Sequence, residues 1–162
     1  MNTSPATLHN KVAVVTGGTQ GLGAAIALLL AQRGAAGVVI CGRQVDKGRA
    51  QAQQITQASG VRVVFVQADL EKVDDCRKVI ATADAEFGRV DVLVNAAAIT
   101  DRGTLLDTDP ALFDRMMAIN VRAPFFLMQE AVKLMRRDQI AGSIVNIGSM
   151  SALAGQPFIA AY

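Results

Sequence analysis

The sequence TGGTQGLG, residues 16–23, directly follows a short apolar run and leads into a helical pattern. Gly17 and Gly18 allow turn conformations that a Cβ atom would forbid. Gly21 lets the backbone approach a pyrophosphate, and Gly23 lets the next helix pack closely on the strand. The free N–H groups at the start of that helix attract phosphate. The segment therefore predicts a dinucleotide-binding turn, with a glycine-rich turn that binds nothing as the alternative.

Apolar runs and helical patterns alternate along the rest of the chain. We expect strands over residues 11–16, 38–41, 61–68, 90–95 and 143–147. We expect helices over residues 21–33, 46–59, 72–87, 110–118 and 124–137. The first helix carries Leu22, Ile26, Leu29 and Leu30 at helical spacing. Because alternating strands and helices are joined by right-handed crossovers, the pattern predicts an α/β fold with a doubly wound parallel sheet.

The predicted sheet holds fewer strands than a dinucleotide-binding fold, which has two halves of three strands each. Its second half has two strands, and no helix follows that could cover the fifth. We therefore expect the N-terminal portion of a longer protein, a Rossmann fold truncated after the fifth strand. Residues 1–10 are expected to form a flexible polar leader, and residues 11–162 a single NAD(P)-binding domain without internal linkers.

Composition limits the classes of partner. The chain has 162 residues, of which 51% are hydrophobic, so it can bury a sizeable core. Its net charge is +2, and the charged residues are spread along the chain without a basic block that would favour binding to nucleic acid or an anionic membrane. Its longest apolar stretch, residues 24–31, is far too short for a membrane span, and the leader does not resemble a signal peptide. We expect a cytoplasmic protein with a small-molecule partner.

Disulfides and metals are not expected. Cys41 and Cys76 lie far apart in apolar or helical contexts, which indicates small core residues rather than a disulfide framework. His9 is the only histidine and lies in the polar leader, so the sequence offers no ligand set for a metal.

The residues after the second predicted strand bear on which dinucleotide is bound. An acidic residue there would accept a hydrogen bond from the ribose 2′-hydroxyl of NAD, but the sequence has Gly42 and Arg43. A carboxylate would repel a 2′-phosphate, whereas an arginine can pair with it through two N–H groups. We expect NADP(H), with NAD(H) as the second choice. The alternative is that Arg43 is an ordinary surface residue and the preference is loose.

Asp69 ends the third predicted strand. Its carboxylate is placed to meet the adenine edge in a fold of this kind, or to cap the following helix. The two roles do not exclude each other.

Several motifs together resemble the short-chain dehydrogenase/reductases, and the resemblance extends from Lys11 to the end of the chain. They are the pattern Thr16-Gly17-x-x-x-Gly21-x-Gly23, Asp69, the segment LVNAAA at residues 93–98, Asn120, Ser149 and Tyr162. Ser149 precedes Tyr162 by thirteen residues, the interval that this family places between its catalytic serine and tyrosine.

The resemblance implies that Tyr162 acts as the general acid or base on a hydroxyl or carbonyl group while the nicotinamide exchanges a hydride. A free tyrosine has a pKa near 10, so a nearby positive charge must lower that pKa before the side chain serves as a base. The family's lysine, four residues after the tyrosine, falls outside this sequence. Ser149 would hold the substrate oxygen, and Asn120 a water on the proton path. Their alternatives are an ordinary loop serine and an asparagine that favours a turn before a proline.

The same resemblance implies a set of cofactor contacts. We expect them from Gly17, Thr19, Gln20, Gly21, Leu22, Gly23, Arg43, Asp69, Leu70, Asn95, Ala96 and Ala97. The segment at residues 95–98 departs from the family's usual Asn-Asn-Ala-Gly, since alanine stands at positions 96 and 98. Ala98 adds a methyl group where the family's glycine lets the backbone approach the nicotinamide ribose, and Ala96 lacks the side-chain amide of the family's asparagine.

These observations favour an NADP(H)-dependent oxidoreductase acting on a sugar, polyol or ketone-like substrate. The main alternative is a dinucleotide-binding module without catalysis, or an inactive fragment. A further interpretation concerns residues 125–128, Phe-Phe-Leu-Met, which form either part of the core or a surface for association. The full-length protein is expected to be a homo-oligomer, a dimer or a tetramer.

Overall fold

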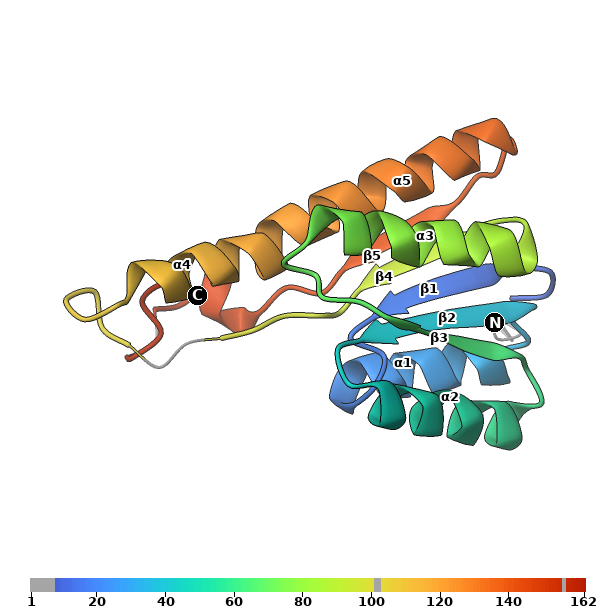
Figure 1. The fold of residues 1–162 in the computed structure, drawn as a ribbon, viewed down its shortest axis with the longest axis horizontal. Coiled ribbons are helices and arrows are strands. Elements are labelled where there is room, and N and C mark those ends of the chain that lie inside the picture. The colour runs from blue at the N-terminus through green and yellow to red at the C-terminus, as the bar shows by residue number, and fades with distance from the viewer. Residues whose placement is uncertain (1–7, 101–102, 156) are drawn as a thin grey trace, which may run out of the picture.

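A computed structural model describes residues 8–100, 103–155 and 157–162 of the chain, so most of the expected leader lies outside the described residues. Five parallel strands form one sheet in the order β3-β2-β1-β4-β5 (Figure 1). Their bounds are β1 Val12–Thr16, β2 Gly37–Gly42, β3 Val63–Gln67, β4 Val92–Asn95 and β5 Ser143–Asn146. The predicted doubly wound parallel sheet is confirmed.

Helices cover both faces of this sheet. Helices α1 and α2 pack on one face, and α3 and α5 pack on the other (Figure 1). Their bounds are α1 Gly21–Gln32, α2 Val45–Ser59, α3 Val73–Phe87, α4 Pro110–Met117 and α5 Ala123–Arg137. Helices α2 and α3 end as predicted, at Gly60 and Gly88, whose left-handed backbone a residue with a Cβ adopts only at a cost.

The core is built on the central strands. All five residues of β1 are buried, as are five of the six in β2, because helices cover both faces of these strands. The predicted first helix is present, but the leucines at helical spacing do not form its buried face: Leu22 and Leu29 are 58% and 51% exposed. Small residues form the buried face instead, among them Ala27 and Ala31. Small side chains suit a helix that packs close to the sheet, and this helix begins against the glycine-rich turn.

The sequence predicts a break between the fourth and fifth helices, but the structure has no loop at this position. A single π-helical turn, η1 (Ala118–Arg122), joins α4 to α5, so the ribbon runs on from Pro110 to Arg137 without a loop (Figure 1). Asn120 lies within that turn. A π turn changes the hydrogen-bonding register inside a helix without ending it, and such turns often occur at functional sites.

The last described segment follows β5 at one edge of the sheet. A short 3₁₀ helix, η2 (Met150–Ala152), begins after Ser149. Beyond it, Ile159 pairs with Gly103 in an isolated parallel bridge, which brings the chain end beside the loop after β4. No helix in the described part of the chain is both long enough and apolar enough to cross a membrane.

Candidate functional site

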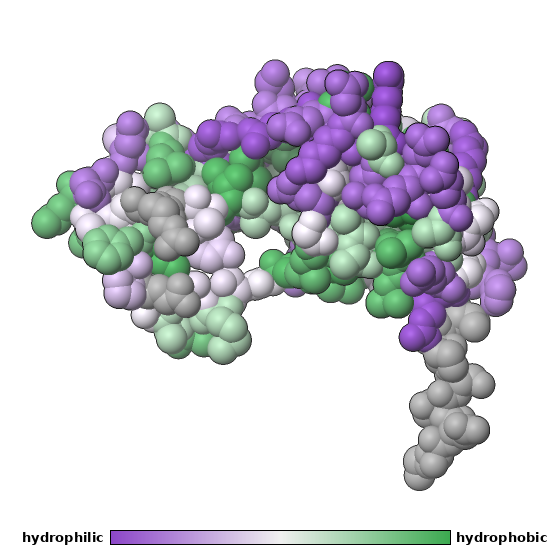
Figure 2. All heavy atoms as spheres, turned by 90° about the horizontal axis from the view of Figure 1, so that it is seen from below, coloured by the Kyte–Doolittle hydropathy of each residue, from purple (hydrophilic) through white to green (hydrophobic). Residues whose placement is uncertain are grey.

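A cavity of about 360 Å³ opens at the carboxyl ends of the central strands. The chain leaves β1 for β2 and β3 on one side and returns to β4 on the other, so the cavity lies where the strand order reverses. Open α/β sheets bind ligands at this position. Figure 2 shows the molecule hollowed between the end that holds α4 and the larger part that holds the sheet. The cavity is lined by Gly17, Thr19, Gln20, Gly21, Leu22, Gly23, Cys41, Gly42, Arg43, Gln44, Lys47, Ala68, Asp69, Leu70, Ala96, Ala97, Ala98, Ile99 and Ile119.

The glycine-rich segment forms a tight turn at the floor of this cavity. Gly17 and Gly21 have φ angles of 66° and 52°, in the region that residues with a Cβ rarely occupy. A Cβ on Gly17 would lie 2.9 Å from the Cα of Ala97, and one on Gly23 would lie 2.4 Å from the main-chain oxygen of Gly17. Gly23 thus brings the helix close to the turn itself, rather than only to the strand.

The first turn of α1 faces the cavity with unused donors. Gln20 is the N-cap residue, but its side chain makes no capping hydrogen bond. Its Oε1 atom instead accepts a hydrogen bond from the Nζ of Lys47, on the first turn of α2. The main-chain N–H groups at the start of the helix are therefore left for a ligand, and such groups bind phosphate well.

The carboxyl end of β2 supplies positive charge. Arg43 is exposed and lines the cavity. Among the residues that the structure describes, no carboxylate pairs with Arg43 or Lys47. A Cβ at Gly42 would lie 2.8 Å from the Cγ2 of Thr19, so an acidic residue there would not fit without moving that side chain. Both features suit a ligand with extra negative charge.

Asp69 and Leu70 line the cavity from the turn between β3 and α3. Asp69 is not the cap of α3, because the N-cap residue is Lys72. Its Oδ1 accepts a hydrogen bond from the N–H of Glu71 at 3.2 Å. Its own N–H donates to the Oδ2 of Asp75 at 2.7 Å. The carboxylate therefore shapes its own turn at the edge of the cavity.

The loop after β4 forms the opposite wall. The Oγ1 atom of Thr16 accepts hydrogen bonds from the N–H groups of Ala96 and Ala97, both at 3.1 Å. Asn95 does not line the cavity: its Nδ2 donates to the Oδ1 of Asn146 at 2.8 Å, which ties β4 to β5. The Oδ1 of Asn95 is buried without a partner among the described residues. Its expected contact with a cofactor therefore has no support from its position.

Asn120 supports the same loop from η1. Its Oδ1 accepts a hydrogen bond from the N–H of Ile99 at 2.9 Å, and its Nδ2 donates to the carbonyl of Ile99 at 2.8 Å. Ile99 and Ile119 both line the cavity. The side chain of Asn120 therefore braces the cavity wall.

Like Asn120, the other two expected catalytic residues do not line the cavity. The Oγ of Ser149 accepts a hydrogen bond from the N–H of Ser151 at 3.2 Å and lies 3.2 Å from the hydroxyl of the same residue. Tyr162 is 43% exposed. No hydrogen bond within the described part of the chain joins Ser149 to Tyr162. The structure brings the expected cofactor contacts together, apart from Asn95, but not the expected catalytic pair.

Sequence reasoning missed several residues of the cavity, including Lys47, Gln44 and Ile119. Thr16 was seen as part of the motif but not as a support for the opposite wall. A polar side chain at the end of an otherwise apolar strand was the available signal for Thr16. The position of Lys47 in the first turn of its helix was a weak signal that it faces the same edge.

Both cysteines are free and buried, as the sequence predicted. Burial raises the pKa of the Cys41 thiol to about 12 and that of Cys76 to about 11. Both thiols are therefore neutral near neutral pH. The described residues contain no cluster of three or more potential metal ligands.

The family model described as short chain dehydrogenase matches residues 11–162. The short-chain dehydrogenase/reductase FrzI of Cladobotryum sp is 37% identical over 151 residues, which are 93% of this chain and 57% of FrzI. The 2-dehydro-3-deoxy-D-gluconate 5-dehydrogenase of Escherichia coli (strain K12) is 38% identical over 148 residues, which are 91% of this chain and 57% of that protein. The chain thus spans somewhat more than half the length of these relatives.

Two further matches mention a cofactor. The NADP-dependent (R)-specific alcohol dehydrogenase of Lentilactobacillus kefiri is 34% identical over 155 residues, 96% of this chain and 60% of that protein. The crystal structure of a metagenomic short-chain oxidoreductase in complex with NADP superposes with a TM-score of 0.89. Its sequence is 36% identical, and the match covers 97% of this chain and 70% of that one.

Proposed function

Since the chain belongs to the short chain dehydrogenase family, we propose that its cavity binds NADP(H). We further propose that the full-length protein is an oxidoreductase that acts on a hydroxyl or carbonyl group of a sugar, polyol or ketone-like compound. NAD(H) is the second choice of cofactor. Relatives in sequence include an NADP-dependent (R)-specific alcohol dehydrogenase, and a solved structure with the same fold is a complex with NADP.

The environment of Arg43 is the observation that carries the choice of NADP(H). Its guanidinium borders the cavity without a carboxylate partner among the described residues, beside a glycine whose Cβ would overlap Thr19. A guanidinium pairs well with a phosphate because its N–H groups match two oxygens at once. The turn at Gly17 and Gly21 and the uncapped start of α1 suit the pyrophosphate of the same ligand.

The chemistry of the chain's own residues follows from this proposal. Bound NADP(H) would supply or accept a hydride at its nicotinamide ring. The hydroxyl of Tyr162 would donate or accept the proton at the substrate oxygen, and the hydroxyl of Ser149 would donate a hydrogen bond to that oxygen. Asn120, whose amide is engaged with Ile99, would contribute by holding the cavity wall in place.

A binding module without catalysis is the second candidate. The positions of Ser149 and Tyr162 favour it, because neither residue lines the cavity that the cofactor contacts share. In this case the chain would bind the dinucleotide through Arg43 and the glycine-rich turn and would transfer no hydride.

Titration of the purified chain with NADPH and NADH, followed by cofactor fluorescence, tests the choice of cofactor. We expect tighter binding of NADPH. Arg43→Ala should weaken NADPH about 10- to 100-fold, the usual effect of losing a charge-assisted pair, and should leave NADH nearly unchanged. Arg49→Ala removes an exposed arginine of α2 that does not line the cavity and serves as the matched control. An equal loss of NADPH affinity in Arg43→Ala and Arg49→Ala would contradict the proposal that Arg43 pairs with the 2′-phosphate.

Turnover separates the two candidates. The full-length protein would be assayed with NADP(H) against sugars, polyols and ketones, beside its Tyr162→Phe variant. An oxidoreductase loses turnover in this variant while its affinity for NADPH is kept, because only the acidic hydroxyl is removed. Binding without turnover by the full-length protein would favour the binding module. We expect little turnover from the 162-residue chain by itself.

Association is part of the same proposal for the full-length protein. Leu127 is buried in the core, but Phe125 is 57% exposed and meets Phe126 edge to face at 5.4 Å between ring centres. The expected apolar stripe is thus split between core and surface. We propose that the exposed part of α5 contributes to a dimer or tetramer, which sedimentation of the full-length protein would test.

A further inference from the structure

The turn between β3 and α3 is tied to the helix that carries Asn120. Arg115 in α4 donates from its Nε to the Oε1 of Glu71 at 2.7 Å. Arg122 in η1 donates from its Nη2 to the main-chain carbonyl of Glu71 at 2.8 Å. One residue of the turn is therefore held at its side chain and at its backbone by two guanidinium groups.

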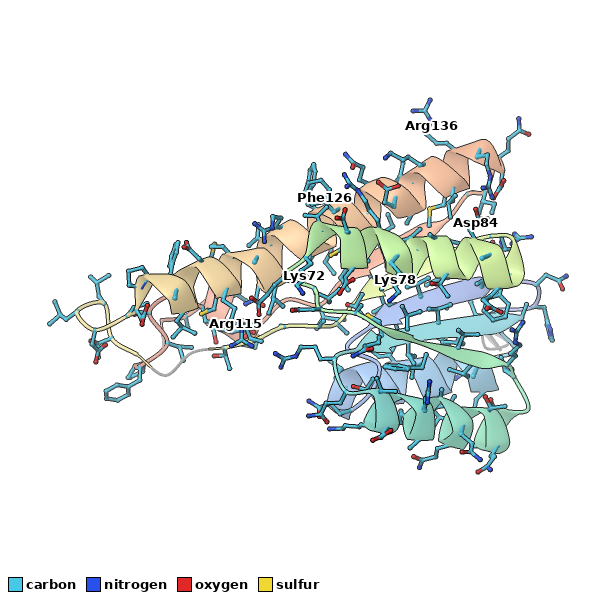
Figure 3. All side chains as sticks on the ribbon, in the orientation of Figure 1. Lys72, Lys78, Asp84, Arg115, Phe126 and Arg136 are labelled. Carbon is cyan, nitrogen blue, oxygen red and sulfur yellow. The ribbon has the colours of Figure 1, made fainter. Side chains whose placement is uncertain are left out.

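The two arginines act from one side of the helix. They are seven residues apart, one in α4 and one in η1, and both guanidinium groups reach the same residue, Glu71. Figure 3 shows Arg115 extending from α4 towards the turn that precedes α3, where Lys72 is labelled. The contacts span 44 and 51 positions of sequence, so they fix tertiary and not local structure.

The turn that they hold is part of the cavity. Asp69 and Leu70, directly before Glu71, line it. The N–H of Glu71 also donates to the Oδ1 of Asp69, so displacement of Glu71 disturbs that carboxylate directly. On its other side the same helix holds Ile99 through Asn120. A single helix therefore braces two walls of the cavity, one after β3 and one after β4.

We propose that Glu71 is a positioning residue for the dinucleotide, because Arg115 and Arg122 use it to fix the Asp69–Leu70 turn before the ligand binds. The inference rests on the proposed function, in which this cavity takes a dinucleotide. Glu71 does not line the cavity and acts only through the turn.

The effect is expected in binding more than in stability. The side chains of Arg115 and Glu71 are 42% and 35% exposed, and ion pairs at such exposure contribute little to the free energy of unfolding. A turn that is no longer held must be ordered when the ligand binds, and this ordering lowers the apparent affinity.

Glu71→Ala in the purified chain tests the proposal by titration with NADPH and with adenosine 2′,5′-bisphosphate, which carries only the adenosine half. We expect the dissociation constant to rise about three- to tenfold for both ligands, as for a site that must first be ordered. Glu71→Gln should recover most of the affinity, because its amide oxygen still accepts from Arg115. The double variant with Arg115→Ala should be no weaker than Glu71→Ala alone, since both changes break one contact.

Lys133→Ala is the matched control, since it removes an exposed ion pair with Glu130 on α5, away from the cavity. Circular dichroism and urea unfolding confirm that each variant is folded; if Glu71→Ala unfolds, Arg115→Ala decides. Unchanged affinity in folded Glu71→Ala and Arg115→Ala, or equal loss in Lys133→Ala, would overturn the inference. Absence of NADPH binding by the unmodified chain would instead overturn the proposed function.

Discussion

Asn120 and Ile99 form a closed pair of hydrogen bonds: the side-chain amide of Asn120 donates to the carbonyl of Ile99 at 2.8 Å and accepts from its N–H at 2.9 Å. An asparagine amide matches a peptide group in this way because it offers one donor and one acceptor side by side. The pair joins the π turn η1 to the loop after β4, two segments that both contribute to the cavity.

Replacement of Asn120 by alanine removes both of these bonds. Since Ile99 is only partly buried, we expect the free energy of unfolding in urea to fall by about 1–3 kcal/mol, the range for two lost hydrogen bonds that water partly replaces. Gln129→Ala, on the exposed side of the neighbouring helix, should change it by less than about 0.5 kcal/mol. If Asn120→Ala lowers the unfolding free energy no more than Gln129→Ala does, the stabilising role of the Asn120–Ile99 hydrogen bonds is contradicted.

Two glycines of the turn should respond differently to alanine. In Gly23→Ala the new Cβ would lie 2.4 Å from the oxygen of Gly17, so we expect a loss of about 2 kcal/mol in unfolding free energy and a displaced turn that binds NADPH poorly. In Gly21→Ala the Cβ meets no atom within 4 Å. Only the φ of 52° is unfavourable for alanine, so we expect the unfolding free energy to fall by about 1 kcal/mol. Urea unfolding and NADPH titration compare the two variants. Greater destabilisation by Gly21→Ala would refute this ranking.

Introducing an acid after β2 should change the cofactor only if space is made for it. Gly42→Asp should weaken NADPH at least about tenfold by repelling its 2′-phosphate. Its Cβ would also meet Thr19 at 2.8 Å, so we expect improved NADH binding only when Thr19→Ala is combined with it. Fluorescence titration of the single and double variants provides the measurement. Equal NADH affinity in both would show that Thr19 does not limit the site.

Asp91 should make the free energy of unfolding depend on pH in the acidic range. Burial acts to raise its pKa, but hydrogen bonds from Arg89, from the N–H of Val12 and from Lys11 outweigh it and hold the pKa of Asp91 below its ordinary value. A lowered pKa in the folded state adds stability that is present above the unfolded value, about 3.9, and is lost as pH falls through the folded value.

We therefore expect the unfolding free energy to fall below about pH 4 and to fall less steeply in Asp91→Asn. At neutral pH this variant should be about 2 kcal/mol less stable, because charged hydrogen bonds are replaced by weaker ones. Urea unfolding from acid to neutral pH measures both effects. An identical acid profile in Asp91→Asn would assign the dependence to other carboxylates, such as Asp84, whose pKa is lowered by Arg137.

The two thiols should be inert in the folded protein. Burial raises the pKa of Cys41 to about 12 and that of Cys76 to about 11, so few thiolates form near neutral pH, and a reagent cannot reach them. We expect an aromatic disulfide reagent to modify neither thiol in buffer and both in urea. Rapid modification of the native chain would mean that α3 opens from the sheet.

The local features of this protein were predictable from its sequence. Apolar runs and glycine stops predicted the five strands and the ends of α2 and α3, because such signals act over a few neighbouring residues. The glycine spacing at residues 16–23 predicted the turn at the carboxyl end of β1, since only glycine fits that close approach. The order of motifs identified the family.

Contacts between residues that lie far apart in the sequence were not predictable. Lys47 meets Gln20 over 27 positions and Arg115 meets Glu71 over 44, contacts that arise only when the sheet brings their elements together. The buried face of α1 was not predictable for a related reason, since the close approach of helix to sheet selects alanines over leucines.

By itself, then, the sequence determined the doubly wound sheet, the glycine-rich turn after β1 and the family, because strand, turn and helix signals are local and their order is read along the chain. Only the tertiary structure decided that Asn95 binds Asn146 rather than facing the cavity, and that Asn120 holds Ile99. The physical reason is that one amide can pair equally well with a ligand, a neighbouring strand or a loop, and only packing selects the partner.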